Sequence, residues 1–154
     1  MRRVLGIRAV PEGFYWAVVE GSADAPIRSA SDRVIFPASY TEPAALSWCR
    51  ERLHHLIDSY KPLLVAVRFP EAFAKAASTD SARRRNRVEG VLLEGANARG
   101  LAVHTAAMAT MSKNLGVKSA KLLLTDKSLR GLDWSGQNDN AKEAIMVAVC
   151  GLEG

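Results

Sequence analysis

The sequence predicts an α/β fold in which three antiparallel strands are followed by parallel strands in one five-stranded mixed sheet flanked by helices. Two runs of β-forming residues open the chain, and turn residues separate them at positions 11–13. Leu63 to Arg68 is a six-residue, mostly apolar run between prolines, with the length and composition of a strand buried on both faces. Helical periodicity on either side of this run indicates crossover connections and hence parallel pairing.

The first two strands are expected at residues 3–10 and 13–20. Pro11, Glu12 and Gly13 between them favour a tight turn, so the two runs form a β-hairpin. A third strand follows at residues 27–36, where arginine and serine alternate with apolar residues. This polar content predicts a position at the sheet edge.

A long helix is expected to carry the chain from the third strand to the fourth. Thr41 reads as its N-cap and Pro43 lies in its first turn. The helix extends to Tyr60, with apolar residues at helical spacing: Leu46, Cys49, Leu53, Leu56 and Ile57. A strand, a crossover helix and a second strand in this order predict a right-handed parallel connection into residues 63–68.

The second half of the chain reads as alternating helices and one short strand. Residues 79–81 can cap a helix over 82–99, and Gly100 ends it before a strand at 101–105. Helices are then expected over 107–115, 118–129 and 139–151, with a loop at 134–137 and Asn138 or Asp139 as the last cap.

Composition indicates one domain over residues 1–154. The 21 Lys and Arg residues exceed the 16 Asp and Glu residues, so the net charge is +5, which favours an anionic partner without identifying it. Arg8 and Pro11 interrupt the apolar stretch after the N-terminus before it reaches the length of a signal-peptide core. We therefore expect a cytoplasmic protein with no membrane partner and no cofactor.

Four short stretches resemble the RuvC-type Holliday junction resolvases of the ribonuclease H-like superfamily. They are the Leu-Gly-Ile-Arg of the first strand (5–8), the helix-to-strand entry at 57–68, the helix-to-strand joint at 94–103 and the opening of the last helix at 139–148. The resemblance extends over nearly the whole chain and implies a ribonuclease H-like fold. It also implies a site of carboxylates that hold two divalent metal ions for phosphodiester cleavage.

The residues at the positions of those carboxylates differ from the family pattern. The resemblance places Arg8, Arg68, Asp139 and Lys142 there, so three of the four ligands are replaced by cations. Two unit charges about 5 Å apart repel by about 3 kcal/mol at an effective dielectric constant of 20. Such a site disfavours Mg²⁺, and we expect a degenerate site with no catalytic residue and no metal.

Two interpretations of the strand-end cations stay open. Arg8, Arg68 and Lys142 can form a phosphate-binding site, because arginine presents a planar fork of donors that matches phosphate oxygens without a metal. Alternatively, these charges at strand ends and a helix start are simply solvated.

A second basic feature opens the helix at 82–99, where Arg83, Arg84, Arg85 and Arg87 occupy the first turns. Five consecutive residues cover more than one helical turn, so some of these side chains must face solvent. Cations at a helix N-terminus oppose the macrodipole, which favours an anionic partner there. Trp134, in its glycine-containing loop, is a candidate for stacking on a base.

Three functions follow from these patterns. The first is a non-enzymatic protein that binds nucleic acid or another phosphorylated ligand through Arg8, Arg68, Lys142 and the arginines at 83–87. The second is an interaction scaffold or homodimer in which the old site does nothing. The third is a divergent metal-dependent nuclease with a displaced acidic site at Asp139 and Glu143, which lie one helical turn apart.

Overall fold

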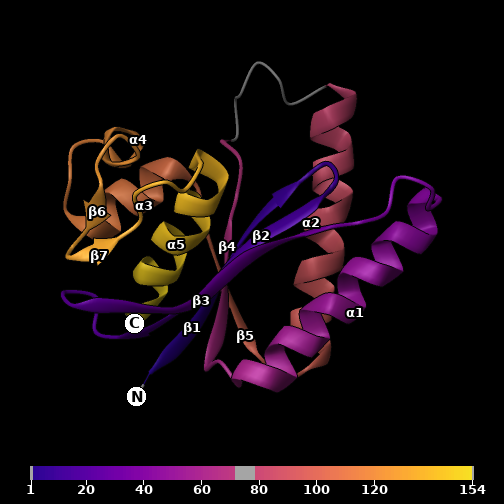
Figure 1. Cartoon of the computed structure of the whole chain (residues 1–154), viewed down its shortest axis with the longest axis horizontal. Helices are drawn as coiled ribbons and strands as arrows, with labels where there is room; N and C mark the ends of the chain where they lie inside the picture. Colours follow the sequence, from indigo (N-terminus) through magenta and orange to yellow (C-terminus); the bar gives the residue numbers. More distant parts are fainter. Residues whose placement is uncertain (1, 72–78, 154) are drawn as a thin grey trace.

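A computed structural model describes residues 2–71 and 79–153 and has a five-stranded sheet at its centre, in the order β3-β2-β1-β4-β5 (Figure 1). The first three strands, β1 (Arg3–Val10), β2 (Gly13–Gly21) and β3 (Pro26–Ile35), are antiparallel neighbours. β4 (Leu64–Arg68) runs parallel to β1, and β5 (Ala102–Ala106) runs parallel to β4. The predicted mixed sheet is confirmed, with the third strand at its edge.

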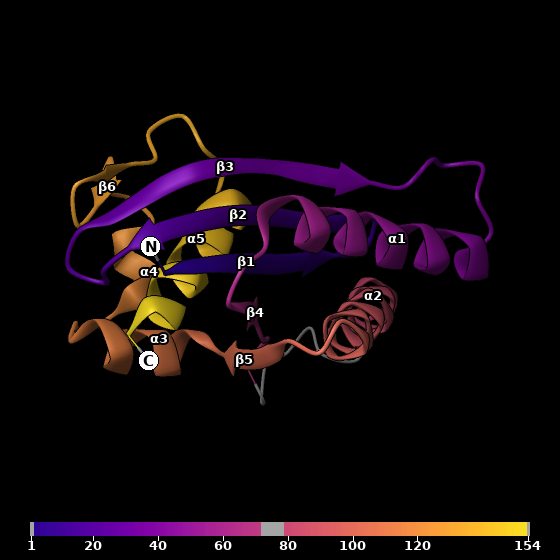
Figure 2. The ribbon, with the colours of Figure 1, turned by 90° about the horizontal axis from the view of Figure 1, so that it is seen from below.

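Helices cover both faces of this sheet (Figures 1 and 2). α1 (Glu42–Tyr60) and α2 (Asp80–Ala98) pack together on one face. The other face carries α5 (Asp139–Leu152), with α3 (Met108–Leu115) and the short α4 (Ala120–Leu123) beside it. Over residues 2–71 and 79–153, no helix combines the length and apolar character needed to cross a membrane.

Three long helices begin at the side-chain caps that the sequence predicts. The Thr41 hydroxyl accepts the Ala44 N–H of α1 at 3.4 Å, and the Thr79 hydroxyl accepts the Ala82 N–H of α2 at 3.1 Å. The Asn138 side-chain oxygen accepts the Ala141 N–H of α5 at 2.9 Å. Each cap satisfies one backbone donor that the first helical turn leaves without a partner.

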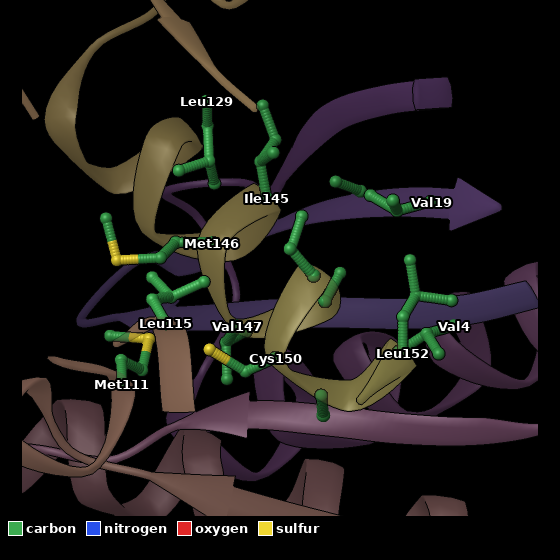
Figure 3. Packing of buried hydrophobic residues seen from close by; sticks show 14 of the residues in the cluster. Val4, Val19, Met111, Leu115, Leu129, Ile145, Met146, Val147, Cys150 and Leu152 are labelled. Carbon is green, nitrogen blue, oxygen red and sulfur yellow. The ribbon is translucent and has the colours of Figure 1, made fainter. Parts of the chain in front are cut away.

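Alternation along the strands divides the core into two layers. Val4, Leu64 and Ala66 face α5, and Figure 3 shows Ile145, Met146 and other side chains of that layer. Leu5, Ile7, Val65 and Val67 face the opposite layer under α1 and α2. Both faces of β1 and β4 are therefore covered, as the apolar run at 63–68 predicts.

The segment after α3 differs from the predicted helix at 118–129. Only α4 is helical there, and a small hairpin follows, made of β6 (Ser128–Leu129) and β7 (Leu132–Asp133). The prediction that Trp134 can stack on a base is also wrong, because its side chain is fully buried. Its indole N–H donates to the Asp126 carbonyl at 2.7 Å, which places that carbonyl in a tertiary contact instead of a helical one.

Gly6 brings α5 close to the middle of β1. A Cβ atom at this position would lie 2.1 Å from the Ala144 carbonyl oxygen and 2.7 Å from the Ala148 Cβ atom. Real Cβ atoms do not approach other atoms so closely, so α5 can contact β1 in this way only over a glycine. The contact sets the height of α5 above the sheet, and with it the position of Glu143, which directly precedes Ala144.

We predict that Gly6→Ala costs roughly 3 kcal/mol or more of unfolding free energy, because α5 must move off the sheet to make room. Gly90→Ala is the matched control, since a Cβ atom there meets nothing within 4 Å and α2 should gain about 0.5–1 kcal/mol. Urea unfolding of both variants measures the difference. Equal stability of the two would contradict the close approach of α5.

Candidate functional site

Arg8 and Arg68 lie side by side at the ends of β1 and β4. Ile7 pairs with Val67 in the parallel ladder, so the two arginines that follow them are level with each other on strands about 4.8 Å apart. Alternation points both side chains toward α5. The two strand-end positions that the family resemblance identifies thus form one site.

Glu143 of α5 bridges the two guanidinium groups. Its Oε1 atom accepts a hydrogen bond from Arg68 Nε at 2.7 Å, and its Oε2 atom lies 3.7 Å from Arg8 Nε. Arg68 is 5% exposed and Glu143 is 6% exposed, so this ion triad is buried. The carboxylate compensates two cations that would otherwise repel each other in a low-dielectric setting.

Arg68 has partners for its remaining donors as well. Its terminal nitrogens contact the Phe69 carbonyl and the Glu71 carboxylate, the latter at 3.4 Å. Glu71 also accepts the Met108 N–H at 3.0 Å, which ties the end of β4 to the start of α3. Arg68 is therefore engaged by protein groups on several sides.

α2 adds Arg85 and Glu89 to the same site. Arg85 is partly buried and Glu89 is only 7% exposed. The charges of Arg85, Arg8 and Arg68 all act on the Glu89 carboxylate. Glu89 is thus within electrostatic reach of three guanidinium groups, which come from β1, β4 and α2.

Several polar atoms in this cluster lack hydrogen-bond partners. The Nε and Nη1 atoms of Arg8, the Nε atom of Arg85 and the Oε2 atom of Glu89 are buried without a hydrogen-bond partner in residues 2–71 and 79–153, although Arg8 Nε is in the ion pair with Glu143. Burial lowers the pKa of Arg8, Glu143 opposes this effect, and the charges of Arg68 and Arg85 lower that pKa further. Burial raises the pKa of Glu89, although the three arginines oppose that shift.

The other arginines of α2 are exposed. Arg83 pairs with Asp80 at 3.1 Å, and Arg87 pairs with Glu42 at 2.7 Å. Arg84 makes no ion pair with the described residues and lines a cavity of about 330 Å³ between α1, α2 and the β1–β2 turn. The prediction that part of the arginine cluster faces solvent is confirmed, while Arg85 turns inward.

The contacts of Lys142 and Asp139 differ from those of Arg8 and Arg68. The Lys142 ammonium donates to the carbonyls of Leu124, at 2.7 Å, and Asp126, at 3.4 Å, and lies 5.6 Å from the centre of the Trp134 ring. Asp139 is exposed in the first turn of α5, whereas Glu143 one turn later is buried between Arg8 and Arg68. The two acidic residues therefore have different surroundings.

This set of residues does not fit a divalent metal site. Both Glu143 oxygens face guanidinium groups, and any cation at the strand ends meets the charges of Arg8, Arg68 and Arg85. No group of three or more His, Cys, Asp or Glu side chains that could hold a metal occurs in the part of the chain that the structure describes. The strand ends therefore present guanidinium donors and positive charge.

The sequence grouped Arg85 with Arg8 and Arg68, but Glu89 was not predicted to lie with them. The spacing of Arg85 and Glu89 carries the signal, because positions 85, 89, 92 and 96 lie on one helical face and Leu92 and Ala96 are buried. A charged pair on the buried face of a helix indicates electrostatic partners from another element. Here those partners are Arg8 and Arg68, whose charges act on Glu89.

The fold is that of ribonuclease H-like α/β proteins: a mixed five-stranded sheet flanked by helices. More narrowly, it is the form of this fold found in RuvC Holliday junction resolvases. The structure titled "T. thermophilus RuvC in complex with Holliday junction substrate" matches with a TM-score of 0.77 and 16% identity, over 97% of this chain and 92% of the other.

Two further comparisons agree with this result. A second Thermus thermophilus RuvC structure gives a TM-score of 0.77 and 18% identity, over 96% of this chain and 92% of the other. The yeast mitochondrial Holliday junction resolvase Ydc2 gives a TM-score of 0.67 and 12% identity, over 99% of this chain and 78% of the other. No family model and no curated protein sequence matches the chain.

We predict that Glu143→Gln lowers the unfolding free energy by about 3–5 kcal/mol, because two buried guanidinium groups lose their compensating charge. Glu94→Gln on α2 is the control, since its exposed pair with Arg50 should contribute less than about 1 kcal/mol. Urea unfolding at pH 7 compares them. A loss in Glu143→Gln no larger than that of the control would contradict a structural role for the triad.

Glu89→Gln should stabilise the protein at neutral pH. The pKa of Glu89 is raised in the folded state, so its contribution to stability is fully present below the unfolded value and is lost as pH rises through the folded pKa. The advantage of the Gln variant should therefore grow with pH from about 4.5 upward. Thermal unfolding from pH 4.5 to 8 measures it.

Glu94→Gln is again the control, because the hydrogen bond from Arg50 lowers the pKa of Glu94 and reverses the sign. A stability difference between wild type and Glu89→Gln that does not change with pH would show that Glu89 does not titrate differently on folding.

Proposed function

We propose that this protein binds nucleic acid through a basic surface made of Arg8, Arg85 and the exposed arginines of α2, and that it has lost two-metal nuclease chemistry. The observation that carries the proposal is the set of buried N–H donors on Arg8 and Arg85 that have no acceptor in the described residues. A buried donor without a partner costs about 1–3 kcal/mol, and a phosphate oxygen is a fitting acceptor for it.

The exposed arginines extend this surface along the start of α2. Arg84 has no ion-pair partner in the described residues, and the pairs made by Arg83 and Arg87 are solvent-exposed. Exposed pairs contribute little, so their arginines can exchange a carboxylate for a phosphate at small cost. The similar fold of T. thermophilus RuvC, solved in complex with Holliday junction substrate, supports DNA as the nucleic acid to test first.

Arg68 and Lys142 have a different place in the proposal. The Arg68 donors contact Glu143, Glu71 and a backbone carbonyl, so Arg68 holds the site together without contacting phosphate. The Lys142 ammonium donates to the Leu124 carbonyl instead and is not part of the proposed binding surface. The loss of cleavage follows from the same arrangement, because cations stand where a two-metal mechanism needs carboxylates. Asp139 and Glu143 do not provide the missing ligands, since Glu143 neutralises two arginines.

The test is fluorescence anisotropy with labelled single-stranded, duplex and four-way-junction DNA at about 50 and 200 mM salt. We expect binding that weakens steeply with salt, with a slope near −0.9 per phosphate neutralised on duplex DNA. Arg83→Ala/Arg84→Ala/Arg87→Ala should reduce this slope and weaken binding at least tenfold. We expect no cleavage when Mg²⁺ is added.

The matched control removes three exposed lysines from the other side of the sheet, Lys113→Ala/Lys118→Ala/Lys121→Ala, and changes the net charge equally. It should bind nearly as well as wild type. If both triple variants lose the same affinity for DNA, the overall charge of the protein would explain the effect without a specific surface. Stable oligomers with no binding at low salt would instead favour the interaction scaffold.

A further inference from the structure

Glu89 sets a chemical condition on any ligand of the arginine cluster. Glu89 is only 7% exposed, and its Oε2 atom has no hydrogen-bond partner in residues 2–71 and 79–153. The unpartnered donors of Arg8 and Arg85 belong to the same cluster. A ligand that completes the site must therefore accept hydrogen bonds from the arginines and also donate one to Glu89.

An internal phosphodiester meets only half of this condition. Its non-bridging oxygens accept hydrogen bonds from Arg8 and Arg85, but it carries no proton to give to a carboxylate. Ionised Glu89 would face another acceptor, and two buried acceptors without a proton between them repel each other. A phosphate monoester differs, because its second ionisation lies near pH 6 and its monoanion keeps a P–OH donor.

We propose that the cluster recognises a phosphate monoester, with Arg8 and Arg85 donating to its oxygens and Glu89 accepting its P–OH proton. The inference rests on the proposed function and deepens it, since on nucleic acid the monoester is a terminal phosphate. Free nucleotides and inorganic phosphate share the chemistry and are the other sources to distinguish.

The site reaches the surface on the side of Arg8 and Arg85. The Arg8 side chain is 13% exposed and Arg85 is partly buried, whereas Arg68 and Glu143 lie deeper. A terminal phosphate projects from the end of a strand, so its free oxygens can approach Arg8 and Arg85 from this side. An internal phosphate is flanked by two sugars, which limit its approach.

One proton is shared between Glu89 and the phosphate in the complex. The groups that act on Glu89 are Arg85 from its own helix, Arg8 from β1 and Arg68 from β4, with Glu143 of α5 facing the last two. Glu71 lies further out, against Arg68. The phosphate monoanion supplies this proton to ionised Glu89, so binding should weaken as pH rises above about 6–7 and the dianion forms.

The experiment compares 5′-phosphorylated and 5′-hydroxyl forms of one labelled single-stranded oligonucleotide at pH 6, 7 and 8. A nucleoside monophosphate and inorganic phosphate serve as competitors. We expect wild type to prefer the phosphorylated strand by about tenfold at pH 6, a difference of about 1.4 kcal/mol, and less at pH 8. The nucleoside monophosphate and inorganic phosphate should both displace the phosphorylated strand.

Two variants assign the preference to Glu89. Glu89→Gln should bind both strands within about twofold of each other and lose the pH dependence, because the neutral amide supplies its own donor. Glu94→Gln, on the exposed side of the same helix, should keep the wild-type preference. A preference that survives in Glu89→Gln would overturn the inference, since charge alone would then explain it.

The remaining outcomes separate this inference from the proposed function. Equal wild-type affinity for the two strands overturns the monoester site and leaves general nucleic-acid binding intact. The nucleoside monophosphate or inorganic phosphate could instead bind in a Glu89-dependent way while neither strand binds. That result would support the monoester site but show that nucleic acid is not its ligand. Absence of binding to all four probes overturns both.

Discussion

The buried ion triad of Arg8, Glu143 and Arg68 is the interaction on which the rest of this site depends. It joins the ends of two parallel strands to the helix that covers them. Burying two neighbouring guanidinium groups carries a large desolvation cost, so a carboxylate must lie between them. Gly6 makes this possible, because it lets α5 approach β1 closely enough to place Glu143 over both arginines.

The triad also accounts for the electrostatic character of the sheet edge. With Arg68 engaged by Glu143, Glu71 and a backbone carbonyl, the unpartnered donors belong to Arg8 and Arg85. Glu89 then stands among cations with an unpartnered oxygen of its own. At this edge of the sheet three guanidinium groups outnumber two carboxylates, and both proposals start from that positive charge.

Much of the fold was predictable from local sequence signals. The hairpin at residues 3–20, the caps Thr41 and Thr79, and the buried strand ending at Arg68 all have the expected bounds to within one or two residues. In these elements, periodicity, turn residues and capping residues agree with the tertiary structure. Family resemblance then placed Arg8 and Arg68 at neighbouring strand ends, which the register confirms.

The errors lie where tertiary contacts override local preference. Residues 118–129 have helical composition, but the Asp126 carbonyl accepts from Trp134 and Lys142, and positive φ at Arg130 and Gly131 closes a hairpin. Tertiary contacts also explain the position of Lys142. The resemblance grouped it with the arginines, but its ammonium group contacts the segment around Leu124. The inward turn of Arg85 fits its position on the buried face of α2, but which elements meet that face depends on tertiary packing that the local sequence does not specify.

The most direct test of the central claim is a titration with Mn²⁺ followed by electron paramagnetic resonance, in wild type and in Arg8→Asp/Arg68→Glu. Because guanidinium groups occupy the strand ends, the wild type should take up no Mn²⁺ at this site at millimolar concentrations. The double variant, with carboxylates at both strand ends beside Glu143, should bind it. One Mn²⁺ bound per wild-type chain and lost in Glu143→Gln would contradict the account.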